Sequence, residues 1–450
     1  MITRIEVNGF KSLENFELNL HPGLNVLVGS NGGGKTNVIL FFEFLSNLVK
    51  TNVSETISRL GGAGAVFRRI GEAEFQSTIQ ATIYGCQQLE DKKDFCHYKY
   101  FFELLFPKKI ESVVFDHQLF AMRSTKSFIK AEDNINNIPW DLIIDQTFEK
   151  NEPKVKIECK DPKIFRSPFF ERHIKKESTI KNRASQIIEK STSDQNSLFY
   201  ALGRFFPLIP QVTEDMVSGE TYNIVPSRVK VPEDSAKVPG IEKDGSGLAA
   251  TLYAIKRKKL ISRPYGLSYY YYRRPRPIFN KSLSVQDLLK YINLANTSIN
   301  GIDVVNDPFN YQLKMTLKIV NGDYQAILPL SSMSDGTIKW IALITAVMTT
   351  TSMFAIEEPE NYLHPLMQSQ ILNIMRDVLI RRRAYSFSIM TTHSETILNS
   401  CNPEELIIVS LSDGMTKAKR CSNAKELKDE IRRTGFKLGY YYLAGAIENE

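Results

Sequence analysis

Gly29-Ser-Asn-Gly-Gly-Gly-Lys-Thr36 is the stretch of sequence that decides the fold. The segment before it, Gly23-Leu-Asn-Val-Leu-Val28, has the composition of a buried strand, and residues 37–48 after it have the apolar spacing of a helix. A strand, a glycine-rich loop and a helix in this order, with the pattern G-x-x-x-x-G-K-T, form the context of a phosphate-binding loop. We therefore expect this stretch to seat the phosphates of a nucleotide.

The polar and glycine positions of this loop each have a chemical reason. Few side chains crowd the loop, so its backbone N–H groups can converge on phosphate oxygens. Lys35 is expected to neutralise phosphate charge, and the hydroxyl of Thr36 to bind Mg²⁺. The residues predicted to hold the nucleotide here are Asn31, Gly32, Gly33, Gly34, Lys35 and Thr36.

Composition places the chain among ordinary globular proteins. It has 450 residues, of which 42% are hydrophobic and 24% charged, a length that suits two or three domains or one large domain with an insertion. The net charge of +7 permits a nucleic-acid partner without requiring one. The five cysteines are scattered and odd in number, which favours reduced thiols. With no signal-peptide pattern and no run able to span a bilayer, the sequence predicts a cytoplasmic protein without a membrane partner.

Shifts in pattern divide the chain into four parts. Residues 1–88 carry the phosphate loop and are predicted to be the first part of a nucleotide-binding head. Residues 89–240, where charged runs alternate with short aromatic stretches, are predicted to be an insertion. Residues 241–410 are predicted to be the second part of the head, and from about residue 301 the alternation of strands and helices implies a parallel sheet covered on both faces. Residues 411–450 add a strand, a charged helix from Ala424 to about Arg433 and an aromatic tail.

Two glutamates come directly after an apolar run that suits a buried strand, Ser352-Met-Phe-Ala-Ile356. The first, Glu357, is expected to hold Mg²⁺ directly or through water, although most phosphate-loop proteins have Asp there. The second, Glu358, is expected to orient and deprotonate the attacking water. The sequence therefore predicts a hydrolytic site and not merely a binding site.

Two further stretches are predicted to contact phosphate. Leu330-Ser-Ser-Met-Ser334-Asp-Gly336-Thr337 precedes a helical run, so Ser334 and Gly336 would present a hydroxyl and N–H groups to an anion. His393 comes after the apolar strand Tyr385–Met390, where ligands bind in parallel sheets, and is expected to contact the γ-phosphate.

In order and spacing, these elements resemble the ABC-type ATPase heads of the RecF, SMC and OLD group, which are AAA family ATPases. The phosphate loop, L-S-x-x-S-D-G-T, E-E-P-E-N-Y-L-H-P and T-T-H-S carry the resemblance, which covers roughly residues 1–85 and 245–435. It implies an α/β P-loop NTPase fold of the ABC-type head, a mixed or parallel sheet with flanking helices and a large α+β insertion between phosphate loop and signature.

The resemblance also implies how ATP is held. In that group two heads sandwich ATP, so Ser334 and Gly336 of one copy would touch the γ-phosphate on the loop of the other. A higher oligomer stays open. Asp335 stands where many ABC transporters have Gly. The family also has a metal-contacting Gln, for which Gln76 is favoured over Gln80, so the predicted metal residues are Thr36, Glu357 and Gln76.

The sequence lacks the long coiled-coil arms of SMC proteins and the clustered C-terminal acids of OLD nucleases. It therefore predicts an ATPase with no nuclease site of its own. Such stand-alone ATPases resemble the ATPase subunits of anti-phage systems such as Septu or PARIS, which implies a separately encoded nuclease as partner.

Alternatives remain at the sequence level. A RecF-like DNA-binding ATPase of repair is the second hypothesis, because Lys256–Lys259 and Tyr269–Arg276 combine cations with rings that stack on bases. The competing interpretation is a solvated helix face followed by an aromatic strand. A transporter subunit fits less well, since about 300 residues separate loop and signature. Tyr440–Tyr442 suit either an assembly surface or core packing.

Overall fold

The computed structural model describes the chain except for a set of short segments and two longer ones. The residues outside the description are 73, 89–93, 108–111, 127, 129–138, 150–151, 161–179, 204–205, 207–208, 218, 259–282, 351–352, 383–384 and 448–450. Lys259 and the stretch Tyr269–Arg276, which carry the DNA-binding hypothesis, lie outside the described residues.

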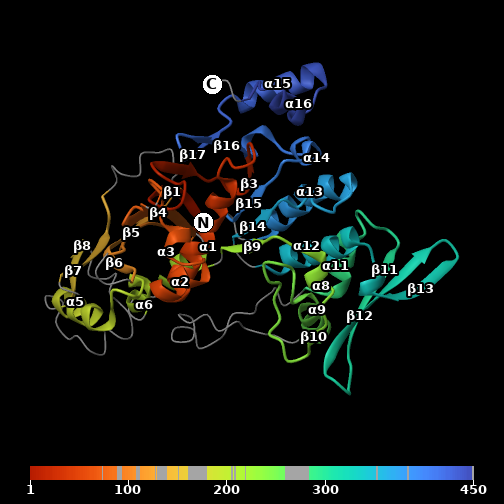
Figure 1. Cartoon of the computed structure of the whole chain (residues 1–450), viewed down its shortest axis with the longest axis horizontal. Helices are drawn as coiled ribbons and strands as arrows, with labels where there is room; N and C mark the ends of the chain where they lie inside the picture. The colour runs from red at the N-terminus through yellow and green to blue at the C-terminus, as the bar shows by residue number, and fades with distance from the viewer. Residues whose placement is uncertain are drawn as a thin grey trace.

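A six-stranded sheet forms the centre of the described structure (Figure 1). Its strands, in spatial order, are β17 (Met415–Arg420), β16 (Leu406–Ser412), β3 (Gly23–Val28), β15 (Phe387–Thr391), β14 (Phe354–Glu357) and β9 (Glu220–Tyr222). The five strands from β16 to β9 run parallel, and β17 is an antiparallel edge strand. Apolar runs suit this position because helices bury both faces of a parallel sheet.

A second, antiparallel sheet holds the N-terminus and most of the predicted insertion. Its order is β2 (Phe16–Asn19), β1 (Ile2–Asn8), β4 (Thr78–Gln88), β5 (Phe95–Leu105), β6 (Val114–Thr125), β7 (Leu142–Glu149) and β8 (Glu152–Cys159). The helix after the phosphate loop, α1 (Lys35–Lys50), lies between this sheet and the parallel one, and all three share a core. The phenylalanines Phe41, Phe42 and Phe44 supply much of that contact.

The other face of the parallel sheet is covered by helices and a β-meander. The helices are α9 (Leu248–Lys256), α11 (Val285–Ile292), α12 (Asp335–Thr349) and α13 (Pro365–Arg381). The meander consists of β11 (Ile299–Asn306), β12 (Gln312–Asn321) and β13 (Tyr324–Pro329), with the short β10 (Glu233–Asp234) paired to β12. For residues 299–329 the expected parallel pairing is wrong, whereas β14, β15 and β16 confirm it for the rest of the range. Short turns link the strands of the meander, and a tight turn joins antiparallel strands.

The predicted insertion is not separate from the head sheets. β5 to β8 extend the sheet of β1 and β4, and β9 pairs in parallel with β14. The chain therefore re-enters the parallel sheet at Glu220, before residue 240, where the insertion was expected to end. The helices of this region are α5 (Ile180–Ser191), α6 (Leu198–Leu202), α7 (Ile209–Val217) and α8 (Pro226–Val229). The rest of the domain division stays a prediction.

The remaining elements are short helices and turns, together with the C-terminal helices. They are α2 (Val53–Arg59), α3 (Ala63–Val66), the 3-10 turns η4 (Leu330–Ser332) and η5 (Pro403–Glu405), α14 (Glu395–Leu398), α15 (Ala424–Thr434) and α16 (Leu438–Leu443). The aromatic tail is helical, and its ring Tyr441 is buried while Tyr440 is half exposed. Among the described helices, none is both long and apolar enough to cross a bilayer.

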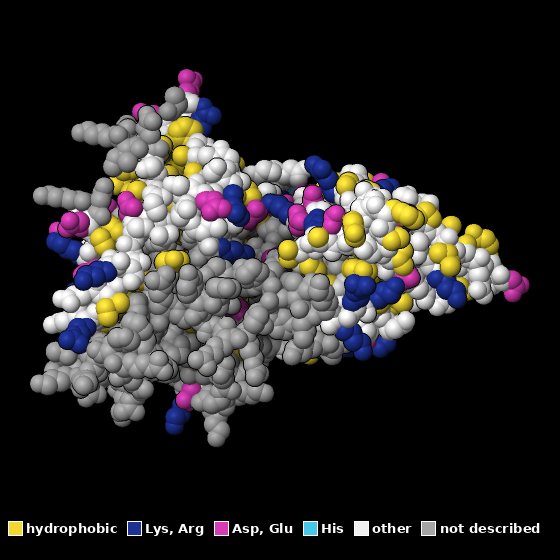
Figure 2. Space-filling model, turned by 90° about the horizontal axis from the view of Figure 1, so that it is seen from below, with side chains coloured by type: hydrophobic (Ala, Val, Ile, Leu, Met, Phe, Trp, Pro, Cys, Tyr) yellow, Lys and Arg dark blue, Asp and Glu magenta, His cyan; other side chains and the backbone are white. Residues whose placement is uncertain are grey.

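The meander forms a narrow projection from the body of the molecule. Seen from below, this end carries hydrophobic side chains interspersed with Lys and Arg (Figure 2). Its exposed apolar residues include Phe309, Tyr324 and Ile327. Because β13 ends at Pro329, directly before η4, this projection leads straight into the signature stretch.

Candidate functional site

The ends of four parallel strands meet at one edge of the central sheet. Leu27 near the end of β3 pairs with Thr391 on β15, Thr391 pairs with Glu357 on β14, and Ile356 pairs with Tyr222 on β9. The residues directly after these strands therefore lie at the same edge, the usual ligand position in such sheets. They are the phosphate loop after β3, Thr392–Ser394 after β15, the acid loop 358–363 after β14 and Asn223 after β9.

The phosphate loop is closed around its lysine. Lys35 is buried, and its Nζ donates to the carbonyl oxygens of Gly29 and Ser30, both at 2.9 Å. Burial lowers the pKa of Lys35, and the Glu358 and Glu360 carboxylates oppose that shift by their charge. The two acids therefore lie within electrostatic reach of the lysine.

Gly34 is required at the start of α1 for two reasons. Its φ of 100° is in the left-handed region, and a Cβ there would stand 1.9 Å from Oγ1 of Thr416 on β17. The Thr416 hydroxyl also lies 2.6 Å from that of Ser12, which accepts from Asn37 at 2.7 Å. The C-terminal edge strand thus supports the loop from behind. Thr36 is exposed on the first turn of α1.

Glu357 ends β14 and points into a buried, polar position. Oε2 accepts from the amide of Asn223 at 3.4 Å, whereas Oε1 is buried and no donor in the described part of the chain reaches it. Burial raises the pKa of Glu357, and the positive charge of Lys243 opposes that shift. A buried carboxylate oxygen without a donor is costly unless a cation completes it.

Glu358 begins the acid loop in an unusual backbone conformation. Its φ is 41°, in the left-handed region, and its N–H donates to the Thr391 carbonyl at 3.0 Å. The carboxylate Oε1 lies 3.9 Å from Nε2 of His393, and Oε2 accepts from Asn361 at 3.2 Å. Non-glycine residues in this region of backbone space cluster at functional sites. The structure thus brings together Lys35, Glu358 and His393.

Glu360 joins the acid loop to the stretch that carries His393, a role not foreseen from the sequence. Its Oε1 accepts from the Thr392 hydroxyl at 2.9 Å and from the His393 N–H at 2.6 Å. Oε2 is a second buried carboxylate oxygen that no described donor reaches. The signal was present as the third acid of E-E-P-E, but its partners come from another strand.

The signature stretch forms the N-terminus of α12. Ser334 is its N-cap, and the Ser334 hydroxyl accepts from the Thr337 N–H at 3.3 Å. A Cβ on Gly336 would lie 2.6 Å from the carbonyl oxygen of Tyr362, so this glycine lets α12 pack against the acid loop of the same chain. Asp335 is paired with Lys230 at 2.8 Å, which offsets its negative charge.

A family model matches the part of the chain that holds most of this site. Residues 222–399 match the model described as "AAA domain, putative AbiEii toxin, Type IV TA system". This range runs from the end of β9 through the signature, the acid loop and His393. Residues 222–399 are therefore similar to an AAA-type ATPase domain, whereas the phosphate loop at residues 29–36 lies outside the matched range. Together with the strand order, the match confirms the predicted α/β P-loop NTPase fold of the ABC-type head.

The other similar proteins match either short segments of this chain or the whole chain at low identity. A 69-residue segment is 35% identical to the DNA replication and repair protein RecF of Renibacterium salmoninarum, covering 15% of this chain and 17% of that protein. A 38-residue segment is 50% identical to RecF of Enterobacter sp., covering 8% and 11%. The matched segments thus span under a fifth of these relatives. The SmcHead bound to the C-winged helix domain of ScpA aligns with a TM-score of 0.47 and 12% identity over 93% of this chain and 97% of that one.

The sheet edge that carries the phosphate loop has a set of oxygens suited to Mg²⁺. Glu357 with its unpaired Oε1, the Asn223 amide and the exposed Thr36 hydroxyl are oxygen donors of the kind Mg²⁺ prefers, so the residues present fit the ion. Gln76 is placed differently. It lies before β4 of the antiparallel sheet, and its amide donates to Glu14 at 3.2 Å. Its Oε1 is buried and no donor in the described part of the chain reaches it, so Gln76 stays a predicted metal residue beside Asn223, at the end of β9.

Proposed function

We propose that two copies of this chain bind ATP with Mg²⁺ between them and hydrolyse it. The observation that carries the proposal is the meeting of Lys35, Glu358 and His393 at one sheet edge, with 3.9 Å between the Glu358 and His393 side chains. Phosphoryl transfer uses a cation at the phosphates, a carboxylate that orients the water and a hydrogen-bond donor, here an imidazole, at the transferred group. The family match over residues 222–399 supports the same activity.

Each residue of the site has a role that its position suggests. Lys35 and the loop N–H groups bind and orient the β- and γ-phosphates. Bound Mg²⁺, held by Thr36, Glu357 and Asn223, would supply charge neutralisation at the phosphates. Glu358 accepts the proton of the attacking water, and His393 donates to a γ-phosphate oxygen. Glu360 fixes the His393 backbone relative to the acid loop.

The second copy enters through the signature. Ser334 and Gly336 stand at a helix N-terminus, whose N–H groups and partial positive charge favour a phosphate. We infer that they close over the nucleotide seated on the loop of the other copy, as in the family that the sequence resembles. Association through ATP is therefore part of the proposal, and a higher oligomer is compatible with it.

Two substitutions test the activity. Lys35→Ala should lower ATP affinity by at least about tenfold, because it removes the charge that the phosphates meet. Glu358→Gln should keep ATP affinity and reduce the hydrolysis rate by roughly 100-fold or more, because the amide cannot accept a proton. The measurements are ATP binding, phosphate release and sedimentation velocity with and without Mg-ATP. Glu358→Gln should sediment as a stable pair of copies in ATP.

Lys314→Met serves as the matched control, because Lys314 pairs with Asp307 on the meander, away from the sheet edge. It should behave as the parent in all three measurements. Hydrolysis by Glu358→Gln at the parent rate would remove Glu358 from the role of base. A parent protein that neither binds nor hydrolyses ATP would contradict the proposal as a whole.

We further propose that the ATPase acts in the cytoplasm as part of an anti-phage defence complex and controls a separately encoded nuclease. The support is a full set of ATPase residues without a recognisable second catalytic constellation in the sequence, and a family description that names a toxin of a toxin–antitoxin system. Co-purification with the product of the adjacent gene, followed by a nuclease assay with and without ATP, tests this. A protein that binds no neighbour would count against it.

A RecF-like role in DNA repair is the second candidate, favoured by the short RecF matches. It predicts salt-dependent binding of duplex DNA. Arg273→Ala/Arg274→Ala should weaken that binding, whereas ATP hydrolysis in the absence of DNA should be unchanged. No effect of these changes on DNA binding, or no binding at all, would leave the defence role as the better account.

A further inference from the structure

Lys339 is a charged side chain that is buried away from water. It lies in α12, five residues after the signature serine, and is 1% exposed. Its Nζ makes one described hydrogen bond, to the backbone carbonyl oxygen of Glu358 at 3.3 Å. The ring of Tyr362 lies beside it, with its centroid 5.8 Å from Nζ. A buried ammonium with a single long hydrogen bond is poorly compensated for its lost hydration.

Lys339 contacts the backbone of Glu358, the residue proposed as general base. Glu358 has a φ of 41°, and Tyr362 at the other end of the same loop has a φ of 68°. Two non-glycine residues in the left-handed region imply a loop that its surroundings must hold in place. The Glu358 carbonyl is held by Lys339 and by the Asn361 N–H at 3.3 Å.

The signature helix and the acid loop also meet next to this contact. Gly336 packs so closely on the Tyr362 carbonyl that a Cβ would approach it to 2.6 Å. Lys339 lies one turn further along the same helix. A shift of the N-terminus of α12 would therefore reach both ends of the acid loop, Tyr362 through Gly336 and the Glu358 backbone through Lys339.

We propose that Lys339 is a positioning residue that couples the signature helix to the general base Glu358, so that the carboxylate is aligned when the signature engages phosphate. This inference rests on the proposed function. Lys339 touches neither nucleotide nor water in this scheme and acts through the Glu358 backbone. The charge of Glu358 and Glu360 favours the ammonium at this place, and burial opposes it, which lowers the pKa of Lys339.

The test separates positioning from mere packing. Lys339→Met keeps the apolar stem and removes the ammonium, so we expect a Tm equal to or above that of the parent. ATP affinity should stay within about twofold, whereas kcat should fall about 10- to 100-fold, the range expected when a catalytic group is misplaced by about 1 Å. Lys339→Gln, whose amide can still donate to the Glu358 carbonyl, should recover part of kcat.

A double variant shows whether Lys339 acts through Glu358. In the Glu358→Gln background, Lys339→Met should lower the residual rate of hydrolysis by less than about twofold. If Lys339 acts only through Glu358, the effects of the two substitutions on the rate are not additive. Lys314→Met is again the control and should match the parent. An unchanged kcat, a fall in kcat that is matched by falls in Tm and ATP affinity, or an additive double variant would each overturn the inference.

Failure of the proposed function gives a different result. It would appear as a parent protein without ATP hydrolysis, or as Glu358→Gln with the parent rate. If the parent hydrolyses ATP and Glu358→Gln does not, the comparison of Lys339→Met with Lys339→Gln bears on the coupling alone.

Discussion

Lys339 binds its proton less tightly in the folded chain than in the unfolded one. Burial lowers its pKa from 10.5 to about 8, although Glu360 and Glu358 oppose the shift. Above pH 8 the folded chain releases this proton, while the unfolded chain still holds it up to about pH 10.5. The unfolded state then binds more protons, so stability rises with pH in this window.

The expected result is a pH-dependent difference between parent and Lys339→Met. Relative to the variant, the parent should gain about 1 kcal/mol of unfolding free energy between about pH 7 and 9. Urea unfolding of both proteins at several pH values measures it. A difference that stays constant across this range would show that Lys339 does not titrate as described.

At the scale of residues, the sequence was most informative about reactive side chains that closely follow an apolar strand. Lys35, Glu358 and His393 each come shortly after an apolar strand, so local pattern was enough to predict their common edge. Glu360 and Lys339 were not foreseen, because their partners come from other elements and no local pattern marks such contacts. The roles assigned to the site residues stay predictions.

At the scale of elements, β9 adds the fourth strand end to the sheet edge where the candidate site lies. It has three residues and places Asn223 beside Glu357. Asn223→Ala should raise the Mg²⁺ concentration for half-maximal ATPase activity about tenfold, because it removes an oxygen and the orienting contact to Glu357.

Asn223→Asp keeps an oxygen at this position and should show a smaller shift than Asn223→Ala. A Mg²⁺ titration of ATPase activity at saturating ATP measures both. If Gln76→Ala shifts the Mg²⁺ requirement and Asn223→Ala does not, the metal contact belongs to Gln76, as the sequence predicts.

The sequence predicted strands with strong apolar runs correctly. It failed for strands whose direction, or whose place in a sheet, depends on pairing with residues far away in the chain. The expected strand Gly23–Val28 is confirmed without change, and the expected charged helix agrees with α15 within a residue. β9 was missed because Glu220-Thr-Tyr222 has no apolar run. The meander was expected to contain parallel strands because strands were predicted to alternate with helices from residue 301, whereas β11, β12 and β13 follow one another without a helix between them.

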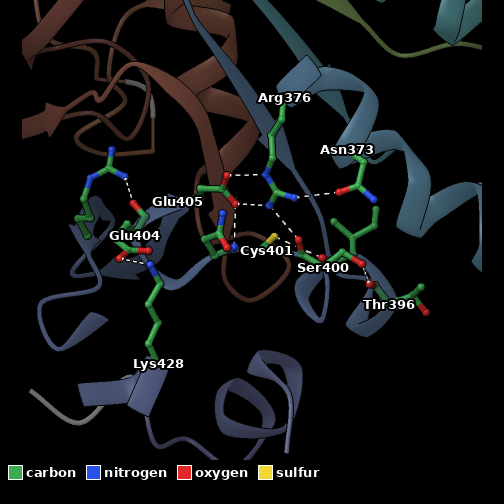
Figure 3. A network of polar contacts seen from close by, with 11 residues as sticks. Asn373, Arg376, Thr396, Ser400, Cys401, Glu404, Glu405 and Lys428 are labelled. Atoms are coloured by element: carbon green, nitrogen blue, oxygen red, sulfur yellow. Dashed lines mark hydrogen bonds and ion pairs between the residues drawn. The ribbon is translucent and has the colours of Figure 1, made fainter. Parts of the chain in front are cut away.

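At the scale of the whole molecule, a polar network ties the head to its C-terminal helices (Figure 3). Arg376 of α13 donates to both carboxylate oxygens of Glu405, at 2.8 and 2.6 Å, and to the Ser400 carbonyl at 2.8 Å. Glu404 next in the chain pairs with Lys428 of α15. The Asn399 side chain accepts from the Gly439 N–H at 2.9 Å, which docks α16 behind α14 and thus behind the His393 stretch.

Removal of the central cation should loosen this region. Arg376→Met leaves Glu405, whose side chain is 14% exposed, without its bidentate partner, and should cost about 2–3 kcal/mol of unfolding free energy. Arg381→Met on the same helix is the control, because the Arg381 side chain is 70% exposed and its pair with Asp377 contributes at most about 0.5 kcal/mol. Thermal unfolding of both variants measures the difference. Equal losses would refute a special role for the network.

The central position of β3 has a consequence for how the protein is made. The strands that pair with β3, namely β15 and β16, are translated long after it, and about 370 residues separate the phosphate loop from β16. At about 5–20 residues per second the ribosome needs roughly 20–70 s for this stretch. During that time both hydrogen-bonding edges of β3 have no strand partner, although α1 can already pack on one of its faces, so the nascent chain is a natural client for chaperones. Nucleotide competence should arise only after β15 and β16 have been made.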